Sequence, residues 1–395
     1  MNKVKISIIV LCCGFIIIMI SIICYKMSNS KHYLNYNSTS STEFNYSDLL
    51  YPENEFDRMR VEELKGKVLN IVNAPVGSKC IINSGATESI ASCIKWSHDY
   101  INKGVIVGSS YDHSAIESNA KNYNMKYKQI DITKDELPDN TAAVFITQVD
   151  SSTGEYQDID SIISNINNEK YLIDGGDVHD YDRVLQYHPL IFLDATQSFM
   201  KLPIDMSKDN INGLFFSIHK LGGEQGLGFL IINESNFIKY KPLIAGEQQE
   251  GLRGGTLPVQ RLLEYPEIFD NIDDNLKRKT AWESTYKKFK DANISVYTPK
   301  NKHLYSTFLI DTKDKCSKEI ISNLADKGIY IGAKSACSLE PLSVENIKDN
   351  NKKDKMSAGS KNKSNKKDKN LIRISFREPN EMQDEIIQKI IDEII

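Results

Sequence analysis

Short apolar runs, separated by polar and glycine-containing turns, dominate the middle of the chain. The runs are Lys79–Ile82, Gly104–Gly108, Ala142–Val149, Tyr171–Ile173, Ile191–Leu193, Leu214–Phe216 and Gly228–Ile232. A brief apolar run bounded by turn residues is typical of a buried parallel strand. Helical patterns such as Ser89–Tyr100 alternate with these runs. The alternation predicts an α/β fold in which helices cover a mostly parallel sheet.

The pattern changes after about residue 262 to that of a smaller α+β unit. Its predicted elements are helices at Asn275–Asp291 and Ser317–Lys327, a strand at Leu304–Ile310, and a closing helix beyond Pro379. In that last helix apolar residues recur every four positions, which gives one apolar face. We therefore expect a large domain over residues 31–262 and a small C-terminal domain over residues 263–395.

Two segments fall outside this pattern. Residues 346–370 consist almost entirely of Lys, Asn, Asp, Ser and Gly, so we expect a disordered insertion without a core. A basic patch for an acidic partner or a lipid headgroup is the alternative. The other segment is Ile6–Tyr25, an uncharged stretch of 20 residues between lysines, which is long enough to cross a bilayer as a helix. It predicts a membrane anchor within residues 1–30, with a cleaved signal peptide as the alternative.

Composition limits the classes of partner and of metal site. The 395 residues carry 49 Lys and Arg against 53 Asp and Glu, a net charge of −4, so no nucleic-acid partner is expected. Beyond the N-terminal apolar stretch the cysteines are Cys80, Cys93, Cys316 and Cys337, and none forms a CxxC pair. Cysteines without paired spacing argue against a zinc site or a disulfide framework and favour a reducing compartment.

Polar side chains of the kinds that catalysis uses follow the fifth and sixth of the apolar runs. They are Asp194 and Gln197 after the first of these, and Ser217, His219 and Lys220 after the second. In open α/β sheets, ligands bind just beyond the carboxyl ends of the strands, so we expect these side chains to converge on one crevice. Lys220, which has polar neighbours and two glycines close behind it, is a candidate Schiff-base nucleophile.

Seven motifs in this chain occur in the order of a known family. They are Tyr33–Thr39, Ser84–Glu88, Asp194–Gln197 with Lys201–Asp205, Ser217–Lys220, Arg253–Pro258, Ser335–Cys337 and Ile372–Ser375. In this order the chain resembles the NifS/IscS-type cysteine desulfurases, which are class-V pyridoxal-phosphate (PLP) enzymes of fold type I. The resemblance runs from about residue 33 to the C-terminus and leaves out the predicted anchor and the insertion. It implies a homodimer that takes L-cysteine as substrate and passes sulfur to an acceptor protein.

The resemblance assigns roles around the cofactor ring. Lys220 binds PLP covalently and shuttles protons, and Asp194 pairs with the ring nitrogen. Gln197 hydrogen-bonds the ring hydroxyl, as does Ser151, which stands where the family has an asparagine. His113, counted with the catalytic residues, matches the histidine that stacks on the ring.

Phosphate binding is expected at the turn formed by Gly85, Ala86 and Thr87. This turn lies between a strand and a helix, where backbone N–H groups and the helix dipole favour an anion. By resemblance, Ser217 and His219 add side-chain donors to the same phosphate.

Three further roles also rest on the resemblance. Thr256 reaches the phosphate in the neighbouring subunit, which implies shared active sites. Cys337 attacks the sulfur of the substrate as a thiolate and keeps it as a persulfide. Arg373 binds the substrate carboxylate with its planar guanidinium.

Taken alone, the same residues allow simpler interpretations. Lys220 is compatible with a surface lysine, Asp194 with a helix-capping aspartate and Cys337 with a buried structural cysteine. The chain also departs from the family pattern at Ser151, in the shortened regions near residues 45–65 and after Cys337, and in the additional segment Tyr171–Tyr187.

Three functions are therefore open. The leading one is a PLP-dependent cysteine desulfurase that converts L-cysteine to L-alanine. Another class-V activity, selenocysteine lyase or aminotransferase, and a degenerate membrane-tethered NifS-like interaction protein are the alternatives. Because a persulfide suits a reducing compartment, we expect a membrane-anchored protein with its catalytic domain in the cytosol.

Overall fold

The structure, a computed structural model, describes residues 32–34, 55–168, 171–173, 185–208, 210–233, 240–264, 266–270, 273–299, 302–333 and 370–395. The chain divides into two compact units. The larger unit consists of residues up to Glu283 together with Tyr297–Phe308. The smaller unit includes Ser284–Val296 and Leu309–Ile395. The boundary expected from the sequence lies earlier, at residue 262.

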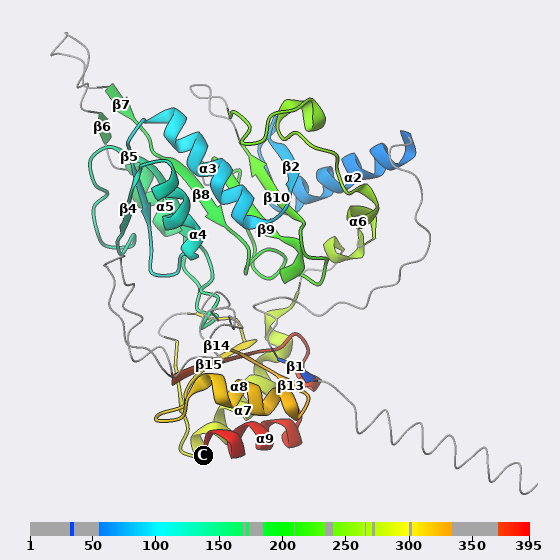
Figure 1. Cartoon of the computed structure of the whole chain (residues 1–395). Helices are drawn as coiled ribbons and strands as arrows, with labels where there is room; N and C mark the ends of the chain where they lie inside the picture. The colour runs from blue at the N-terminus through cyan, green and yellow to red at the C-terminus, as the bar shows by residue number, and fades with distance from the viewer. Residues whose placement is uncertain are drawn as a thin grey trace, which may run out of the picture. The chain divides into compact units, whose positions relative to one another are not determined.

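A seven-stranded sheet with the order β2-β10-β9-β8-β5-β3-β4 forms the centre of the larger unit (Figure 1). Its strands are β2 (Lys79–Asn83), β3 (Val105–Gly108), β4 (Lys126–Gln129), β5 (Thr141–Thr147), β8 (Leu190–Asp194), β9 (Gly213–Ser217) and β10 (Gly228–Ile232). Strand β10 is antiparallel to β2 and β9, and the four remaining neighbouring pairs are parallel. Consequently β2, β3, β5, β8 and β9 all present their carboxyl ends at one edge of the sheet.

Helices cover both faces of this sheet. They are α2 (Glu55–Ile71), α3 (Ala86–Tyr100), α4 (Ser114–Asn122), α5 (Ile159–Asn168) and α6 (Val259–Leu263). Alternate strand residues point to opposite faces. Phe216 packs in a core with α2, α5 and α6, whereas its neighbour Phe215 packs in a second core with α3 and α4. Figure 1 shows α3 crossing in front of the sheet. Because both faces are buried, the strands are apolar at nearly every position, which explains the continuous runs in the sequence.

The C-terminal part of the chain is α+β. Its elements are α7 (Lys279–Asp291), β11 (Ser295–Val296), β12 (Thr307–Asp311), α8 (Ser317–Asp326), β13 (Ile329–Tyr330), β14 (Gly332–Ala333), β15 (Leu371–Ser375) and α9 (Asp384–Ile394). Strands β11, β12, β15 and β14 form a four-stranded sheet in that order, and β13 pairs with β1 (His32–Tyr33). Helix α9 buries Ile386, Ile390 and Ile394, which confirms the apolar face predicted from their spacing.

One predicted strand has a different partner from the one expected. Strand β6 (Tyr171–Ile173) pairs with β7 (Leu185–Tyr187) in a separate two-stranded antiparallel sheet. A short apolar run therefore does not by itself reveal which strand lies beside it. The sequence also missed β4, whose residues Lys126–Gln129 are mostly exposed at the sheet edge.

The prediction of a membrane anchor is corrected. Across the part of the chain that the structure describes, no helix combines the length and the apolar character needed to cross a bilayer. The longest helix in that part, α2, has 17 residues and includes several charged ones, whereas a span needs about 20 apolar residues. The segment Ile6–Tyr25 itself lies outside the described residues, as do residues 346–369 of the predicted insertion. The predictions of an N-terminal transmembrane helix and of a membrane-anchored protein are therefore withdrawn.

Candidate active site

The predicted residues Asp194 and Ser217 lie at the carboxyl ends of adjacent parallel strands. Asp194 is the last residue of β8, and its backbone is in register with Thr147 of β5 and Phe215 of β9. Ser217 ends β9 and is followed by a short 3-10 helix, Ile218–Lys220, which carries the lysine. The predicted convergence at the carboxyl edge of the sheet therefore follows from the strand order β9-β8-β5.

Asp194 is a buried carboxyl group that faces two basic side chains. Its side chain is 5% exposed, and its Oδ1 accepts a hydrogen bond of 2.9 Å from the backbone N–H of Thr196. Burial raises the pKa of Asp194, while Thr196 and the charges of His113 and Lys220 act in the opposite direction. The neighbouring donor and charges do not fully offset the cost of burying the ionised Asp194 carboxylate. A further cationic partner would therefore stabilise it.

His113 occupies the N-cap position of α4. Its Nδ1 accepts a hydrogen bond of 3.2 Å from the backbone N–H of Ala115. The surrounding protein desolvates the ring and lowers the pKa of His113, Asp194 raises it, and Lys220 lowers it further. The imidazole is therefore neutral near pH 7, and because Nδ1 is an acceptor, the proton resides on Nε2. Burial, followed by the charge of Lys220, likewise lowers the pKa of His219 to about 4.

The predicted phosphate-binding turn lies at the N-terminus of α3, where the backbone is closely packed. Gly85 has φ of 143°, and a Cβ there would lie 3.3 Å from Ser217 Oγ. A Cβ on Gly228 would lie only 2.4 Å from the Cα of Gly85. The backbone N–H of Ala86 donates to Ser217 Oγ at 2.8 Å, so the serine hydroxyl can still donate its own proton. Because Gly85 supplies no capping side chain, the amides of the first helical turn that follow Ala86, beginning with that of Thr87, are available to an anion.

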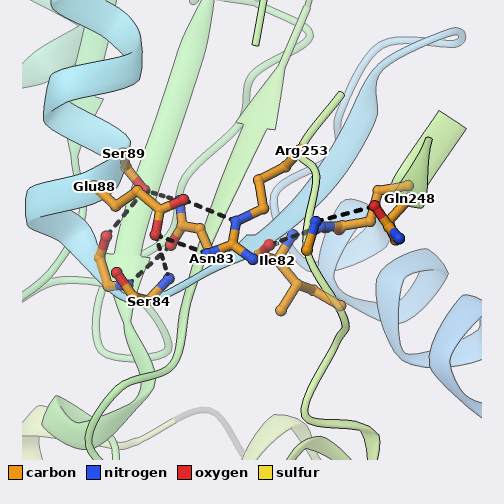
Figure 2. Close-up of polar contacts among 10 residues, drawn as sticks. Ile82, Asn83, Ser84, Glu88, Ser89, Gln248 and Arg253 are labelled. Carbon is orange, nitrogen blue, oxygen red and sulfur yellow. Dashed lines mark hydrogen bonds and ion pairs between the residues drawn. The ribbon is translucent and has the colours of Figure 1, made fainter. Parts of the chain in front are cut away.

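A network of hydrogen bonds between the end of β2 and the start of α3 holds this turn in place. The N–H of Gly85 donates to Asn83 Oδ1 at 3.0 Å, and Asn83 Nδ2 donates to Ser89 Oγ at 2.7 Å. Glu88 Oε2 accepts from the N–H of Ser84 at 2.9 Å. Figure 2 shows Asn83, Ser84, Glu88 and Ser89 gathered around the start of the helix. The turn is therefore held by side chains on both the strand and the helix that it joins.

Arg253 ties a distant loop to the same helix. Its Nε and Nη2 donate to the two oxygens of Glu88 at 2.9 and 3.2 Å, a two-pronged ion pair (Figure 2). Neither residue has a role predicted from the sequence, although Arg253 begins one of the family motifs and Glu88 ends another. Nothing in the order of the motifs shows that these two side chains meet.

Two glutamines complete the docking of this loop onto the sheet. The side-chain amide of Gln249 both accepts from the N–H and donates to the carbonyl of Ile82, each at 2.8 Å, and so pairs with the edge strand β2. Gln248 Oε1 accepts from the N–H of Gly255 at 3.0 Å. Thr256, the next residue, is exposed in the single chain.

The Glu88–Arg253 ion pair should stabilise the fold in a pH-dependent way. Burial alone raises the pKa of Glu88, but hydrogen bonds from Arg253 and Ser84 outweigh it and hold the pKa below its ordinary value of 4.5. The stabilisation is therefore fully present above pH 4.5 and is lost as the pH falls through the lower folded-state pKa. We expect Glu88→Gln to lower the free energy of unfolding at pH 7 by about 1–3 kcal/mol.

Denaturant unfolding at pH 7 and at about pH 3 measures this effect, since the difference from wild type should shrink at the lower pH. Glu117→Gln is the matched control, because Glu117 pairs with Lys121 while 49% exposed. The control should change the stability by no more than about 0.5 kcal/mol. An equal loss for Glu88→Gln at both pH values would contradict the prediction.

The remaining predicted residues are distributed as follows. Gln197 is buried just beyond β8, Ser151 is half-buried in the turn after β5, and Thr87 is exposed in the first turn of α3. Arg373 is fully buried in β15 of the smaller unit, with its backbone paired to Gly332. Cys337 lies outside the described residues.

The residues that converge fit pyridoxal phosphate in three respects. The raised pKa of buried Asp194 suits a pyridinium N–H, which would restore the ionised carboxylate. The uncapped turn at Gly85 suits a phosphate, and the space there is one that added Cβ atoms would fill. Lys220, whose charge acts on Asp194, has the amine that a covalent link to the cofactor would need.

Comparison with known proteins places this site in a family. Residues 53–386 match the family Aminotransferase class-V. Cysteine desulfurase IscS of Plasmodium falciparum (isolate 3D7) is 30% identical over 227 residues, 52% of this chain and 38% of that protein. Cysteine desulfurase IscS of Glaesserella parasuis serovar 5 (strain SH0165) is 26% identical over 300 residues, 72% of this chain and 71% of that protein. Against other such relatives the chain spans about half of their length.

Solved structures share the fold. A NifS-like protein has a TM-score of 0.70 at 17% identity, over 92% of this chain and 99% of its own. A NifS-like protein from Rickettsia africae ESF-5 has a TM-score of 0.66 at 20% identity, over 92% and 98%. These likenesses confirm the α/β fold, fold type I of the PLP-dependent transferases, and the IscS relatives confirm the resemblance drawn from the motifs. Because the family match covers most of its length, this chain belongs to the class-V aminotransferases, a family of enzymes that use pyridoxal phosphate.

Proposed function

We propose that this protein is a PLP-dependent cysteine desulfurase, which converts L-cysteine to L-alanine and keeps the sulfur as a persulfide on Cys337. The observation that carries the proposal is the convergence of Asp194, His113 and Lys220 at the carboxyl edge of the sheet. The names of the IscS relatives support cysteine as the substrate.

Each of the three converging residues has a defined task in this proposal. When bound, PLP supplies an electron sink for the amino acid attached to it. Asp194 remains ionised beside the ring nitrogen and keeps that nitrogen protonated. Lys220 would hold the cofactor covalently, and its Nζ would accept and return the Cα proton of the substrate. His113 covers the ring as a neutral imidazole.

The polar residues around these three orient the cofactor. The turn formed by Gly85, Ala86 and Thr87 holds the phosphate. Its donors are the N–H of Thr87 and the hydroxyl of Ser217, since the N–H groups of Gly85 and Ala86 already donate within the protein. His219, which is neutral because its pKa is lowered to about 4, adds a further N–H donor. Gln197 and Ser151 hydrogen-bond the ring hydroxyl.

Sulfur transfer requires a thiolate and an anchored substrate. Cys337 attacks the Sγ of the substrate, so that an S–S bond forms while the substrate Cβ–Sγ bond breaks. The electron pair of that bond remains on the carbon, which takes a proton to give L-alanine. Arg373 binds the substrate carboxylate, and its persistent charge and planar fork suit that task. An acceptor protein then removes the outer sulfur by thiol exchange.

The proposed protein is a homodimer with shared active sites. Thr256 is exposed in the single chain, at the end of a loop that Arg253 and Gln249 hold against the sheet. An exposed hydroxyl on a fixed loop is suited to reach the phosphate in a second subunit.

The test is an assay of the full chain with PLP, L-cysteine and a thiol reductant, in which alanine and sulfide are measured separately. Equal amounts of both products are expected, and Cys337→Ser should reduce both by at least about 10²-fold. Cys316→Ser is the matched control, since Cys316 is an exposed free cysteine and should leave both rates unchanged. Product formation that ignores Cys337 would indicate another class-V reaction instead.

A further inference from the structure

A partly buried polar cluster that the proposed reaction does not use is centred on Asp112, one residue before His113. Oδ1 of Asp112 accepts from Thr147 Oγ1 at 2.8 Å and from Ser109 Oγ at 3.3 Å. Oδ2 accepts from the N–H of Ser109 and from the hydroxyl of Tyr127, each at 3.1 Å. The donors come from the ends of β3 and β5 and from within β4, three adjacent strands of the sheet.

The carboxylate lies directly against the backbone of β3. A Cβ placed on Gly108 would lie 1.9 Å from Asp112 Oδ2 and 2.8 Å from the Tyr127 hydroxyl. The loop is also closed by its own backbone, since the N–H of Asp112 donates to the carbonyl of Ser109 at 3.3 Å. Residues 109–112 therefore form a tight turn around one carboxylate, and that carboxylate joins three strands.

This turn delivers His113 to the site. The backbone of His113 is extended, with φ of −70° and ψ of 138°, and its Nδ1 is held by the N–H of Ala115. The ring position thus depends on two anchors, the start of α4 on one side and the Asp112 turn on the other. Loss of either anchor frees the backbone that sets the direction of the imidazole.

We propose that Asp112 is a positioning residue, whose carboxylate gathers donors from β3, β4 and β5 and so fixes the loop that presents His113. The inference rests on the proposed function only in taking His113 as the group that covers the cofactor ring. Asp112 acts through His113 and does not itself contact the reacting atoms.

The ionised form of Asp112 is a cost to stability. Burial raises the pKa of Asp112 to about 7, Asp194 adds to the rise, and the hydrogen bonds from Thr147, Ser109 and Tyr127 oppose it. Burial raises the pKa of Tyr127, and the charge of Asp112 and that of Glu117 on α4 raise it further, so that Tyr127 remains a neutral donor. Because the folded-state pKa lies above the ordinary 3.8, the penalty grows as the pH rises through that interval.

Asp112→Asn in the full chain tests the proposal, because asparagine keeps the shape and removes the charge and one acceptor. In the PLP-loaded protein we expect kcat for L-cysteine to fall roughly 10- to 100-fold with KM little changed, since misplacement of a group near the chemistry costs about that much. The melting temperature at pH 8 should equal or exceed that of wild type. Asp160→Asn, an exposed carboxylate on α5, is the control and should change neither quantity.

A double-mutant cycle shows whether Asp112 acts through His113. If it does, Asp112→Asn combined with His113→Ala should be no slower than His113→Ala alone. Additive losses in kcat would overturn the proposal. So would an Asp112→Asn variant with the kcat of wild type.

A measurement on the apoprotein separates this proposal from the proposed function. With ¹⁵N-labelled histidine, the His113 ring nitrogens, assigned by their absence in His113→Ala, should report the Nε2–H form in wild type. In Asp112→Asn this signal should shift or broaden, and unchanged ring signals would sink the proposal. If wild type shows no desulfurase activity, the ring signals still decide the role of Asp112. If Asp112→Asn does not fold, Tyr127→Phe is the second variant, because it removes a single donor to the Asp112 carboxylate. It should change the same ring signals in the same direction by a smaller amount. Unchanged ring signals in this variant would contradict the proposal.

Discussion

Replacement of Lys220 by alanine should abolish covalent attachment of PLP and lower the rate of sulfide formation by roughly 10³-fold or more. The side chain stands at the end of the short helix after β9, and its charge acts on both Asp194 and His113. Its loss removes the nucleophile that binds the cofactor and the Nζ that moves the Cα proton. The measurement is the visible absorption of the purified protein before and after borohydride reduction, together with the sulfide assay.

Lys121→Ala is the matched control for this variant, since Lys121 is an exposed lysine paired with Glu117 on α4. It should keep both the absorption and the rate of wild type. A Lys220→Ala protein that still retains PLP through reduction and denaturation would show that another amine binds the cofactor. That result would remove the basis of the proposed site.

Asp194→Asn should lower the activity without lowering the stability of the apoprotein. We expect kcat to fall roughly 10²- to 10³-fold, because a neutral amide no longer holds a proton on the ring nitrogen by charge. Since burial raises the pKa of Asp194, the ionised carboxyl destabilises the apoprotein at pH values above its ordinary 3.8. The apoprotein of the variant should therefore unfold at the same temperature as wild type or higher.

Thermal unfolding of the apoproteins at pH 8 and steady-state kinetics of the PLP-loaded forms are the two measurements. Asp131→Asn serves as control, because Asp131 is exposed and its pKa is lowered by hydrogen bonds from Lys134 and Thr133. A destabilised Asp194→Asn apoprotein with normal kcat would reverse both expectations. It would assign Asp194 to the fold and not to the cofactor.

The strands and their polar ends were predictable because they rest on local pattern. A buried parallel strand needs apolar residues on both faces, and Gly228–Ile232 was placed with the bounds that the structure has. The extent of β8 and β9 was underestimated by one residue at each end, since Asp194 and Ser217 are polar yet belong to the ladder. The polar residue at the carboxyl end of each strand was therefore mistaken for the first residue beyond the strand.

Pairing across the chain was beyond the reach of such patterns. Nothing local separates β6, which joins a hairpin with β7, from the apolar strands of the main sheet. The strand β4 escaped notice because an edge strand needs few apolar residues. The anchor predicted from Ile6–Tyr25 is withdrawn, because no helix in the described part of the chain could serve as a membrane span.

By itself, the sequence determined the α/β class and the family, and it predicted Lys220 and Asp194 as the central residues of the site. These depend on short motifs and on strand-length periodicity, which are local properties. Only the tertiary structure decided that Arg253 meets Glu88, 165 positions away, and that Asp112 gathers donors from three strands. The physical reason is that a hydrogen bond depends on two side chains meeting in space, and the strand order that brings them together is set by packing of the whole sheet.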